Sequence, residues 1–135
     1  ATAANPLRLS DVFFRQTGDA QANTLTGGAN RDVLIGGGGA DTLVSGAGND
    51  FLQGDAGADT FVLSGGKNHV WDYEAGVDTI QIDSSAYGGA TSILTQQLNS
   101  GQRIYALVNG AEVDIAVIEG ITPATALTNS DFVFV

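Results

Sequence analysis

The chain has no cysteine and no methionine, and it is poor in basic residues. Without cysteine, neither disulfide bonds nor thiolate metal sites can form. Only 5 Lys and Arg stand against 15 Asp and Glu, so the formal net charge is -10 and a phosphate backbone would be repelled. Nucleic acid is therefore excluded as an expected partner. The missing initiator predicts a processed piece or an excised module of a longer protein.

Long hydrophobic runs are also absent. No stretch approaches the roughly 18 apolar residues of a membrane helix, and residues 1–6 lack the basic region of a secretory signal. Hydrophobic residues still make up 43% of the 135, which is too many for a disordered acidic tail. We expect one module, with an N-terminal cap over 1–17, repeats over 18–71 and a closing segment with antiparallel strands over 72–135.

Glycine is abundant, with 19 copies, and they concentrate in a segment that repeats every nine residues without insertion. Five units begin at Gly18, Gly27, Gly36, Ser45 and Gly54, and a degenerate sixth unit spans 63–71. The sixth place holds an acid or its amide: Asn23, Asp32, Asp41, Asp50, Asp59 and Asn68. The eighth place holds an apolar residue: Leu25, Leu34, Leu43, Leu52, Phe61 and Val70. This fixed phase argues against a flexible linker, and the glycine spacing does not fit a phosphate-binding loop.

Each unit predicts a tight turn followed by a short strand, because its glycine-rich first six residues accept positive φ and its last three are β-prone and apolar at the centre. The pattern resembles the nonapeptide repeat of the RTX family, Gly-Gly-x-Gly-x-Asp-x-U-x with U apolar, a calcium-binding repeat. The likeness continues to about Asp83, since 61–63, 70–73 and 76–80 resemble the segment that closes RTX modules in secreted metalloproteases, lipases and alginate epimerases.

The resemblance implies an all-β fold: a parallel β-roll, two units to a coil of 18 residues, followed by antiparallel strands packed against it. The end units depart from the pattern, with Asp19 and Asp55 at the second place, Gln21 and Asn30 at the fourth, and Asn at the sixth place of the first and last units. These departures weaken the expected sites at the two ends of the array, while the central sites are unaffected.

In such a roll, stacked turns bring together Asp32 with Asp50 and Asp41 with Asp59, and two mixed pairs, Asn23 with Asp41 and Asp50 with Asn68. Two carboxylates in adjacent stacked turns repel each other unless a cation lies between them. Calcium accepts about six to eight oxygens in flexible geometry, whereas magnesium prefers stricter octahedra and zinc prefers His or Cys. We predict two calcium sites from the acid pairs and up to two weaker ones from the mixed pairs.

The residues predicted to form these sites are Asn23, Asp32, Asp41, Asp50, Asp59, Asn68 and Asp78, with Gly27, Gly36, Gly38, Gly46, Gly48, Gly54 and Gly57 in the turns. The resemblance suggests that Asp72 or Asp78 either helps the last site or caps a turn. One core side chain per unit does not offset the backbone entropy of nine ordered residues, so we expect the repeats to be disordered in calcium-poor cytosol and to fold outside the cell.

The outer faces of the predicted roll differ. Val33, Ile35, Phe51 and Trp71 point outward on one sheet, which needs a cover, and Thr24, Thr42 and Thr60 form a column on the other. Such a column is most often a solvated face; a regular binding plane for a polymer or ice is the alternative.

Antiparallel strands are predicted over 104–109 and 112–118, joined by the type I′ turn signal Asn109-Gly110, with a strand over 92–98 before them. Their apolar faces are expected to cover the exposed sheet. A short helical turn is predicted over 122–127. The final strand, 131–135, resembles the uncleaved signal of type I secreted RTX proteins, and a plain edge strand fits it equally well.

Catalytic motifs are missing, since the single His69 excludes a His-Glu-x-x-His zinc site and no Gly-x-Ser-x-Gly occurs. We expect no enzyme, and we expect Asp72, Glu74 and Asp78 not to act as a glycosidase pair. The favoured hypothesis is a secreted, extracellular calcium-binding RTX module that supports type I secretion and stability of a larger polypeptide, with its upstream domain and the secretion apparatus as partners. The alternatives are an accessory module that binds an alginate-like polysaccharide, and a structural piece of an adhesin or surface layer.

Overall fold

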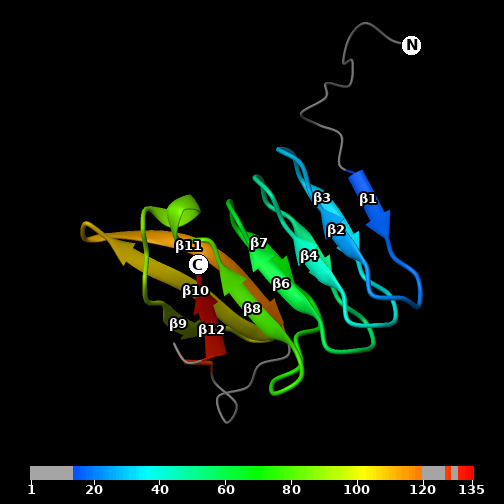
Figure 1. The fold of residues 1–135 in the computed structure, drawn as a ribbon. Helices are drawn as coiled ribbons and strands as arrows, with labels where there is room; N and C mark the ends of the chain where they lie inside the picture. The colour runs from blue at the N-terminus through cyan, green and yellow to red at the C-terminus, as the bar shows by residue number, and fades with distance from the viewer. Residues whose placement is uncertain (1–13, 120–126, 129–130) are drawn as a thin grey trace, which may run out of the picture.

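The computed structural model describes residues 14–119, 127–128 and 131–135 (Figure 1). In this part of the chain every regular element is a strand except the 3-10 helix η2 (Ser84–Tyr87), which confirms the predicted all-β fold. No helix within these residues is long and apolar enough to cross a membrane. The strands are β1 (Phe14–Thr17), β2 (Thr24–Thr26), β3 (Asp32–Ile35), β4 (Thr42–Val44), β5 (Phe51–Gln53), β6 (Thr60–Leu63), β7 (Asn68–Val70), β8 (Thr79–Ile82), β9 (Leu94–Gln97), β10 (Gly101–Val108), β11 (Ala111–Glu119) and β12 (Phe132–Phe134).

Strands of successive repeat units alternate between two sheets. The 7-stranded sheet has the order β1-β3-β5-β7-β11-β10-β9, and the 5-stranded sheet has the order β12-β8-β6-β4-β2. Within each sheet the repeat strands are parallel, and residues of one coil face the residues 18 positions later: Thr24 faces Thr42, Thr42 faces Thr60, and Phe51 faces His69. This arrangement is the predicted parallel β-roll with two units per coil, and Figure 1 shows its stacked turns.

The core of the roll lies between the two sheets and is built from the eighth place of each unit. Leu34, Leu43, Leu52, Phe61 and Val70 are fully buried, and Leu25 in the first unit is 8% exposed. Because side chains alternate in a strand, the residues on either side of each buried position point outward. The single apolar place per unit therefore fills the space between the sheets, as the sequence predicts.

The antiparallel strands extend the 7-stranded sheet. β10 and β11 form a hairpin whose turn residues, Asn109 and Gly110, have φ of 54° and 80°, as a type I′ turn requires. A bulge interrupts their register, because Ile104 pairs with Ala116 while Tyr105 pairs with Asp114. The extra residue, Ile115, lets two consecutive side chains of β11 be buried.

The prediction that these strands cover the outer face of the sheet is wrong. β11 pairs in parallel with β7 and continues the sheet sideways, and Trp71 on the outer face remains 51% exposed. The physical reason is that β7 is the last repeat strand of its sheet and would otherwise leave a row of unpaired backbone N–H and C=O groups. Pairing satisfies this edge, while the outer face stays accessible.

The ends of the chain also join the sheets. β1 pairs in parallel with β3 and extends the 7-stranded sheet beyond the first unit, and β12 pairs in parallel with β8, which confirms the final strand over 132–134. Residues 1–13 of the expected cap and 122–126 of the expected helical turn lie outside the described residues. The helix η2 was not predicted from the sequence; Asp83 caps it by accepting a hydrogen bond from Ser85 N.

Candidate calcium-binding turns

The sixth-place side chains stack in two lines, one along each edge of the roll. The backbone N–H of each of the first four sixth-place residues donates to the side chain of the equivalent residue one coil later: Asp32 N to Asp50 Oδ1 at 2.7 Å, and Asp41 N to Asp59 Oδ1 at 2.9 Å. The same bond links Asn23 N to Asp41 Oδ1 at 2.7 Å and Asp50 N to Asn68 Oδ1 at 3.2 Å. All four pairs expected from the nine-residue spacing are thus brought together.

The four central aspartates each keep one carboxylate oxygen without a partner. Asp32, Asp41, Asp50 and Asp59 are at most 2% exposed. The buried oxygens that accept no hydrogen bond are Asp32 Oδ1, Asp41 Oδ2, Asp50 Oδ2 and Asp59 Oδ2. Burying an ionised oxygen with no partner is costly, and the two acid pairs each contain two such oxygens. A divalent cation that binds oxygen ligands fits this arrangement.

Burial raises the pKa of Asp50 and of Asp59 to about 6. The N–H groups of Asp32 and Asp41 lower these pKa values, and the neighbouring carboxylates raise them again. The environment of both side chains thus disfavours the ionised form, and a bound calcium ion would reverse this preference because it binds the ionised carboxylate.

The first-place glycines lie directly against the carboxylates. A Cβ added to Gly27 would lie 2.6 Å from Asp32 Oδ2, and one added to Gly36 would lie 2.5 Å from Asp41 Oδ2; Gly54 is in the same contact with Asp59 Oδ2. Any other residue at these places would fill the space beside the carboxylate. Calcium at the acid pairs would therefore draw on the two aspartates and on carbonyl oxygens of these turns, since no three His, Cys, Asp or Glu side chains cluster as ligands within the described residues.

The turns of units three to five share a backbone that units one and two lack. In units three to five, the second-place and fourth-place residues all have positive φ: Gly37, Gly39, Gly46, Gly48, Asp55 and Gly57. No second-place or fourth-place residue of units one and two, both within the described part, has positive φ. Gly38 has no positive φ, but a Cβ added there would lie 3.3 Å from the Cα of Ala20, which is a tight contact.

Asp72 and Asp78 differ from the four central aspartates, because both oxygens of each accept backbone hydrogen bonds. Asp78 accepts from Asp59 N at 2.9 Å and from Glu74 N at 2.8 Å. Asp72 accepts from Gly54 N at 2.8 Å and from Asp55 N at 2.7 Å. Of the two roles that the sequence left open, this geometry favours turn caps at the end of the array.

One contact was missed by the sequence reasoning. Asn68 donates from Nδ2 to the hydroxyl of Tyr87 at 3.2 Å. Tyr87 lies outside the repeats. The sequence signals near it are a possible helix cap at Asp83 and the pair Gly88-Gly89, which together indicate a short helical turn but not its contact with Asn68.

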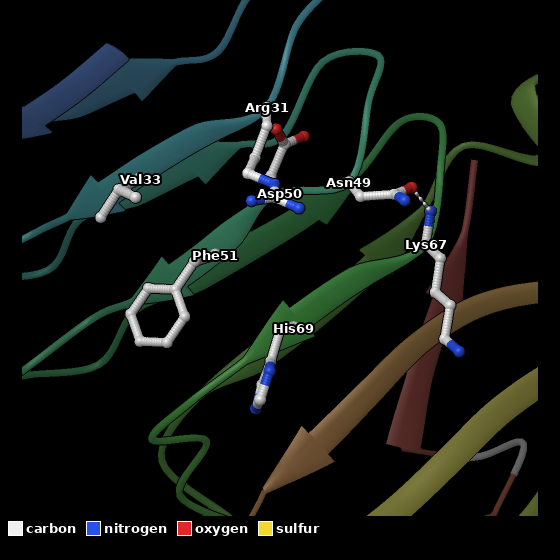
Figure 2. A pocket seen from close by; sticks show the side chains of 7 residues that line it. All are labelled: Arg31, Val33, Asn49, Asp50, Phe51, Lys67 and His69. Atoms are coloured by element: carbon white, nitrogen blue, oxygen red, sulfur yellow. Dashed lines mark hydrogen bonds between the residues drawn. The ribbon is translucent and has the colours of Figure 1, made fainter. Parts of the chain in front are cut away.

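The outer face of the 7-stranded sheet carries aromatic and basic side chains. The rings of Phe51, His69 and Trp71 have centroids 5.7 to 5.9 Å apart. His69 Nε2 lies 2.9 Å from Glu119 Oε1 on β11. A pocket of about 370 Å³ adjoins these rings, and Figure 2 shows the residues that line it: Arg31, Val33, Asn49, Asp50, Phe51, Lys67 and His69.

Most of the few basic residues gather on this face. Strand pairing places six residues opposite one another in one row across the sheet, in the order Arg15, Val33, Phe51, His69, Val117 and Arg103. Arg103 contacts Asp114 and Glu112 and lies 4.1 Å from the ring centroid of Tyr105. Glu112, Asp114 and Glu119 lie against these side chains, so the face carries paired charges of both signs beside Arg31 and Lys67 of the pocket.

A family profile and solved structures match the chain. The profile of the RTX calcium-binding nonapeptide repeat (4 copies) matches residues 17–52 and 35–70. No curated protein matches the chain significantly. The AlgE6R3 subunit of the Azotobacter vinelandii mannuronan C5-epimerase has 27% identity and a TM-score of 0.65, over 98% of this chain and 84% of that one.

Two further solved structures match the chain. The AlgE6R2 subunit of the same epimerase has 22% identity and a TM-score of 0.60, over 87% of this chain and 91% of that one. The extracellular lipase LipA of Serratia marcescens has 20% identity and a TM-score of 0.49, over 90% of this chain and 21% of that one. Residues 17–70, with their acid-bearing turns stacked as a parallel β-roll, belong to the family of RTX calcium-binding nonapeptide repeats.

Proposed function

We propose that this chain is a non-catalytic calcium-binding module that folds on meeting calcium outside the cell. In this role it supports type I secretion and the stability of a larger polypeptide. The observation that supports the proposal is the set of four buried carboxylate oxygens without hydrogen-bond partners, arranged as two acid pairs between stacked turns.

The acid pairs make folding depend on the metal. Without a cation, each pair holds two carboxylates together in a buried turn, which opposes the folded state. A ligand that binds only the folded state at 100 times its dissociation constant adds about 2.7 kcal/mol of stability. Two such sites in one cooperative array are comparable with the marginal stability of a small domain, so calcium concentration decides whether the repeats are ordered.

Circular dichroism and NMR of the 135-residue chain, with chelator and with millimolar calcium, test this proposal. We expect dispersed amide resonances and strand signal in calcium only. Asp50→Asn removes one member of an acid pair and should raise the calcium concentration needed for folding. Asp55→Asn is the matched control, because it removes an equal charge from a turn residue outside the pairs. Identical spectra with and without calcium would refute the proposal.

The secretion role needs its own experiment. The chain is placed behind a passenger domain in cells that carry a type I secretion apparatus, and exported passenger is measured with low and high calcium outside the cell. We expect the double variant D32N/D50N to export less passenger than the wild type at high calcium. Equal export by the two would show that secretion does not depend on calcium binding, and would refute this role.

A second candidate function is binding of an acidic polysaccharide, and the outer face of the 7-stranded sheet favours it. The exposed ring of Trp71 and the half-buried ring of Phe51 offer flat apolar surfaces. Arg31 and Lys67, which line the pocket beside Phe51, offer donors for carboxylates. A structural relative with 27% identity is a subunit of an enzyme named for mannuronan.

NMR titration of the calcium-loaded chain with oligouronates tests this candidate, with a neutral oligosaccharide of equal length as the comparison. We expect amide shifts around Phe51, Lys67 and Trp71, and loss of binding in Trp71→Ala. Val133→Ala is the control, because Val133 is an exposed apolar side chain on the 5-stranded sheet, 45% accessible. Shifts spread over both sheets, or none at millimolar ligand, would remove this candidate.

A further inference from the structure

The tyrosine at the end of η2 reaches into the last turn of the repeat array. Tyr87 is 2% exposed, and its hydroxyl makes three hydrogen bonds with unit six. It accepts from Gly65 N at 3.2 Å and from Asn68 Nδ2 at 3.2 Å, and it donates to Gly66 O at 2.8 Å. One proton and two lone pairs are the full hydrogen-bonding capacity of this hydroxyl, so all of it is directed at a single turn.

Unit six follows unit four on the same line, and their sixth-place side chains use one atom in the same way. Asp50 Oδ1 accepts from Asp32 N at 2.7 Å, and Asn68 Oδ1 accepts from Asp50 N at 3.2 Å. The second side-chain atom differs in chemistry. In Asp50 it is a buried oxygen without a partner, whereas in Asn68 it is an amino group that donates to Gly65 O at 3.1 Å and to Tyr87.

Because of this difference, the turn of unit six requires hydrogen-bond acceptors where the turn of unit four requires a cation or a donor. An unpartnered carboxylate oxygen requires a cation or a donor, whereas an amino group requires acceptors and repels a cation. The turn of unit six obtains its acceptors from its own carbonyl and from the tyrosine hydroxyl. It obtains its third contact from the hydroxyl proton, which satisfies Gly66 O.

We propose that Tyr87 closes the line of calcium-binding turns: its hydroxyl supplies the last turn with the contacts that metal ions supply to the turns before it. The mixed pair of Asp50 and Asn68 is then not a calcium site, and Tyr87 is a positioning residue for the array. The inference rests on the proposed calcium binding of the acid pairs, and it assigns the end of that array to protein groups.

The surroundings of Tyr87 hold the hydroxyl in this role. A phenol is protonated at physiological pH, so the Tyr87 hydroxyl carries the proton that it donates to Gly66 O at 2.8 Å. The ring is fixed by the short helix, which is capped by Asp83 at its start and ends at Gly88 with φ of 69°. A Cβ on Gly88 would lie 2.9 Å from Val108 Cγ1 on β10, so this segment is packed against the antiparallel strands.

Calorimetric calcium titration of the full chain tests the proposal in four forms: wild type, Tyr87→Phe, Tyr73→Phe and the double variant N68D/Y87F. Tyr87→Phe keeps the ring but leaves a buried donor and acceptor unsatisfied, so we expect the calcium concentration for half-folding to rise by about tenfold with the number of ions unchanged. Tyr73→Phe is the control, because Tyr73 is also buried, at 9% exposed, and makes no hydrogen bond to the repeat turns in the described chain. N68D/Y87F places a carboxylate opposite Asp50 and removes the hydroxyl, so it should bind one ion more than the wild type.

The outcomes separate this proposal from the proposed function. If the wild type takes up no calcium, the proposed function fails. If the wild type binds calcium but the double variant gains no ion, or Tyr87→Phe behaves as Tyr73→Phe does, only the role of Tyr87 is overturned. Should Tyr87→Phe not fold, NMR of the calcium-loaded wild type decides the question. A slowly exchanging Tyr87 hydroxyl proton close to the Asn68 amino group supports the proposal, and its absence overturns it.

Discussion

Lowering the pH from 7 to 5 should weaken calcium binding and stabilise the calcium-free fold. The pKa of Asp50 and of Asp59 is raised by burial from 3.8 to about 6. Each belongs to a different acid pair, so at each site the ionised fraction of one carboxylate falls from about nine tenths at pH 7 to about one tenth at pH 5. Because calcium binds the ionised form, we expect the apparent dissociation constant of each site to rise about tenfold.

The metal-free chain should respond in the opposite direction. A folded-state pKa above the unfolded value contributes stability that is complete below about pH 4 and is lost as the pH rises through about 6. Residual strand signal in chelator is therefore expected to increase on acidification, while the calcium midpoint moves upward.

Strand circular dichroism and the fluorescence of Trp71, followed through calcium titrations at pH 5 and pH 7, provide the assay. His69→Gln is run in parallel, because His69 is the single histidine and lies 2.9 Å from Glu119. A calcium midpoint that does not change between the two pH values, or a shift that disappears in His69→Gln, would refute the assignment to the buried aspartates.

Three further predictions concern single side chains. Gly36→Ala should abolish calcium binding at its turn, because the added Cβ would lie 2.5 Å from Asp41 Oδ2. Gly28→Ala, where an added Cβ would meet no atom within 4 Å, should bind calcium as the wild type does; calorimetry distinguishes the two, and equal binding by both would contradict the fit. Leu43→Ala removes a fully buried core side chain and should lower the free energy of unfolding in calcium by about 2 to 5 kcal/mol, measured with denaturant. Gly110→Ala, at φ of 80°, should cost about 1 kcal/mol without changing the calcium midpoint, and a melting temperature equal to that of the wild type would contradict the type I′ turn.

The nine-residue phase was enough to predict a turn and a short strand in each unit, because each of its requirements is local, and the resemblance to RTX repeats added the parallel β-roll. A turn that needs glycine, a single apolar place and a carboxylate recur at fixed spacing, and stacking then follows from strand pairing between units two apart. The pairing of Asp32 with Asp50 and of Asp41 with Asp59 is a direct consequence, and the structure places them so.

What the sequence could not provide depends on contacts between distant segments. β11 pairs with the edge strand β7 instead of covering the sheet, and this pairing joins residues about 50 positions apart. No local sequence pattern indicates it. The number of hydrogen bonds that each acid accepts is likewise a property of the folded turns, so Asp78 and Asp41 look alike in the sequence and differ in the structure. Tyr87 has no periodic partner at all.

The 18-residue separation between bonded turns restricts how this array can change in length. Each acid pair joins one coil to the next, so an isolated coil has half of a site on either edge, and two stacked coils are the smallest piece that can hold an ion. Insertion or loss of a single nine-residue unit between Phe51 and Trp71 would transfer everything after it to the opposite sheet, which separates these two rings and carries β7 and β11 together to the other sheet. Growth or shortening by whole coils is the only route that preserves the surfaces downstream, and each added coil would bring one more metal position to both edges.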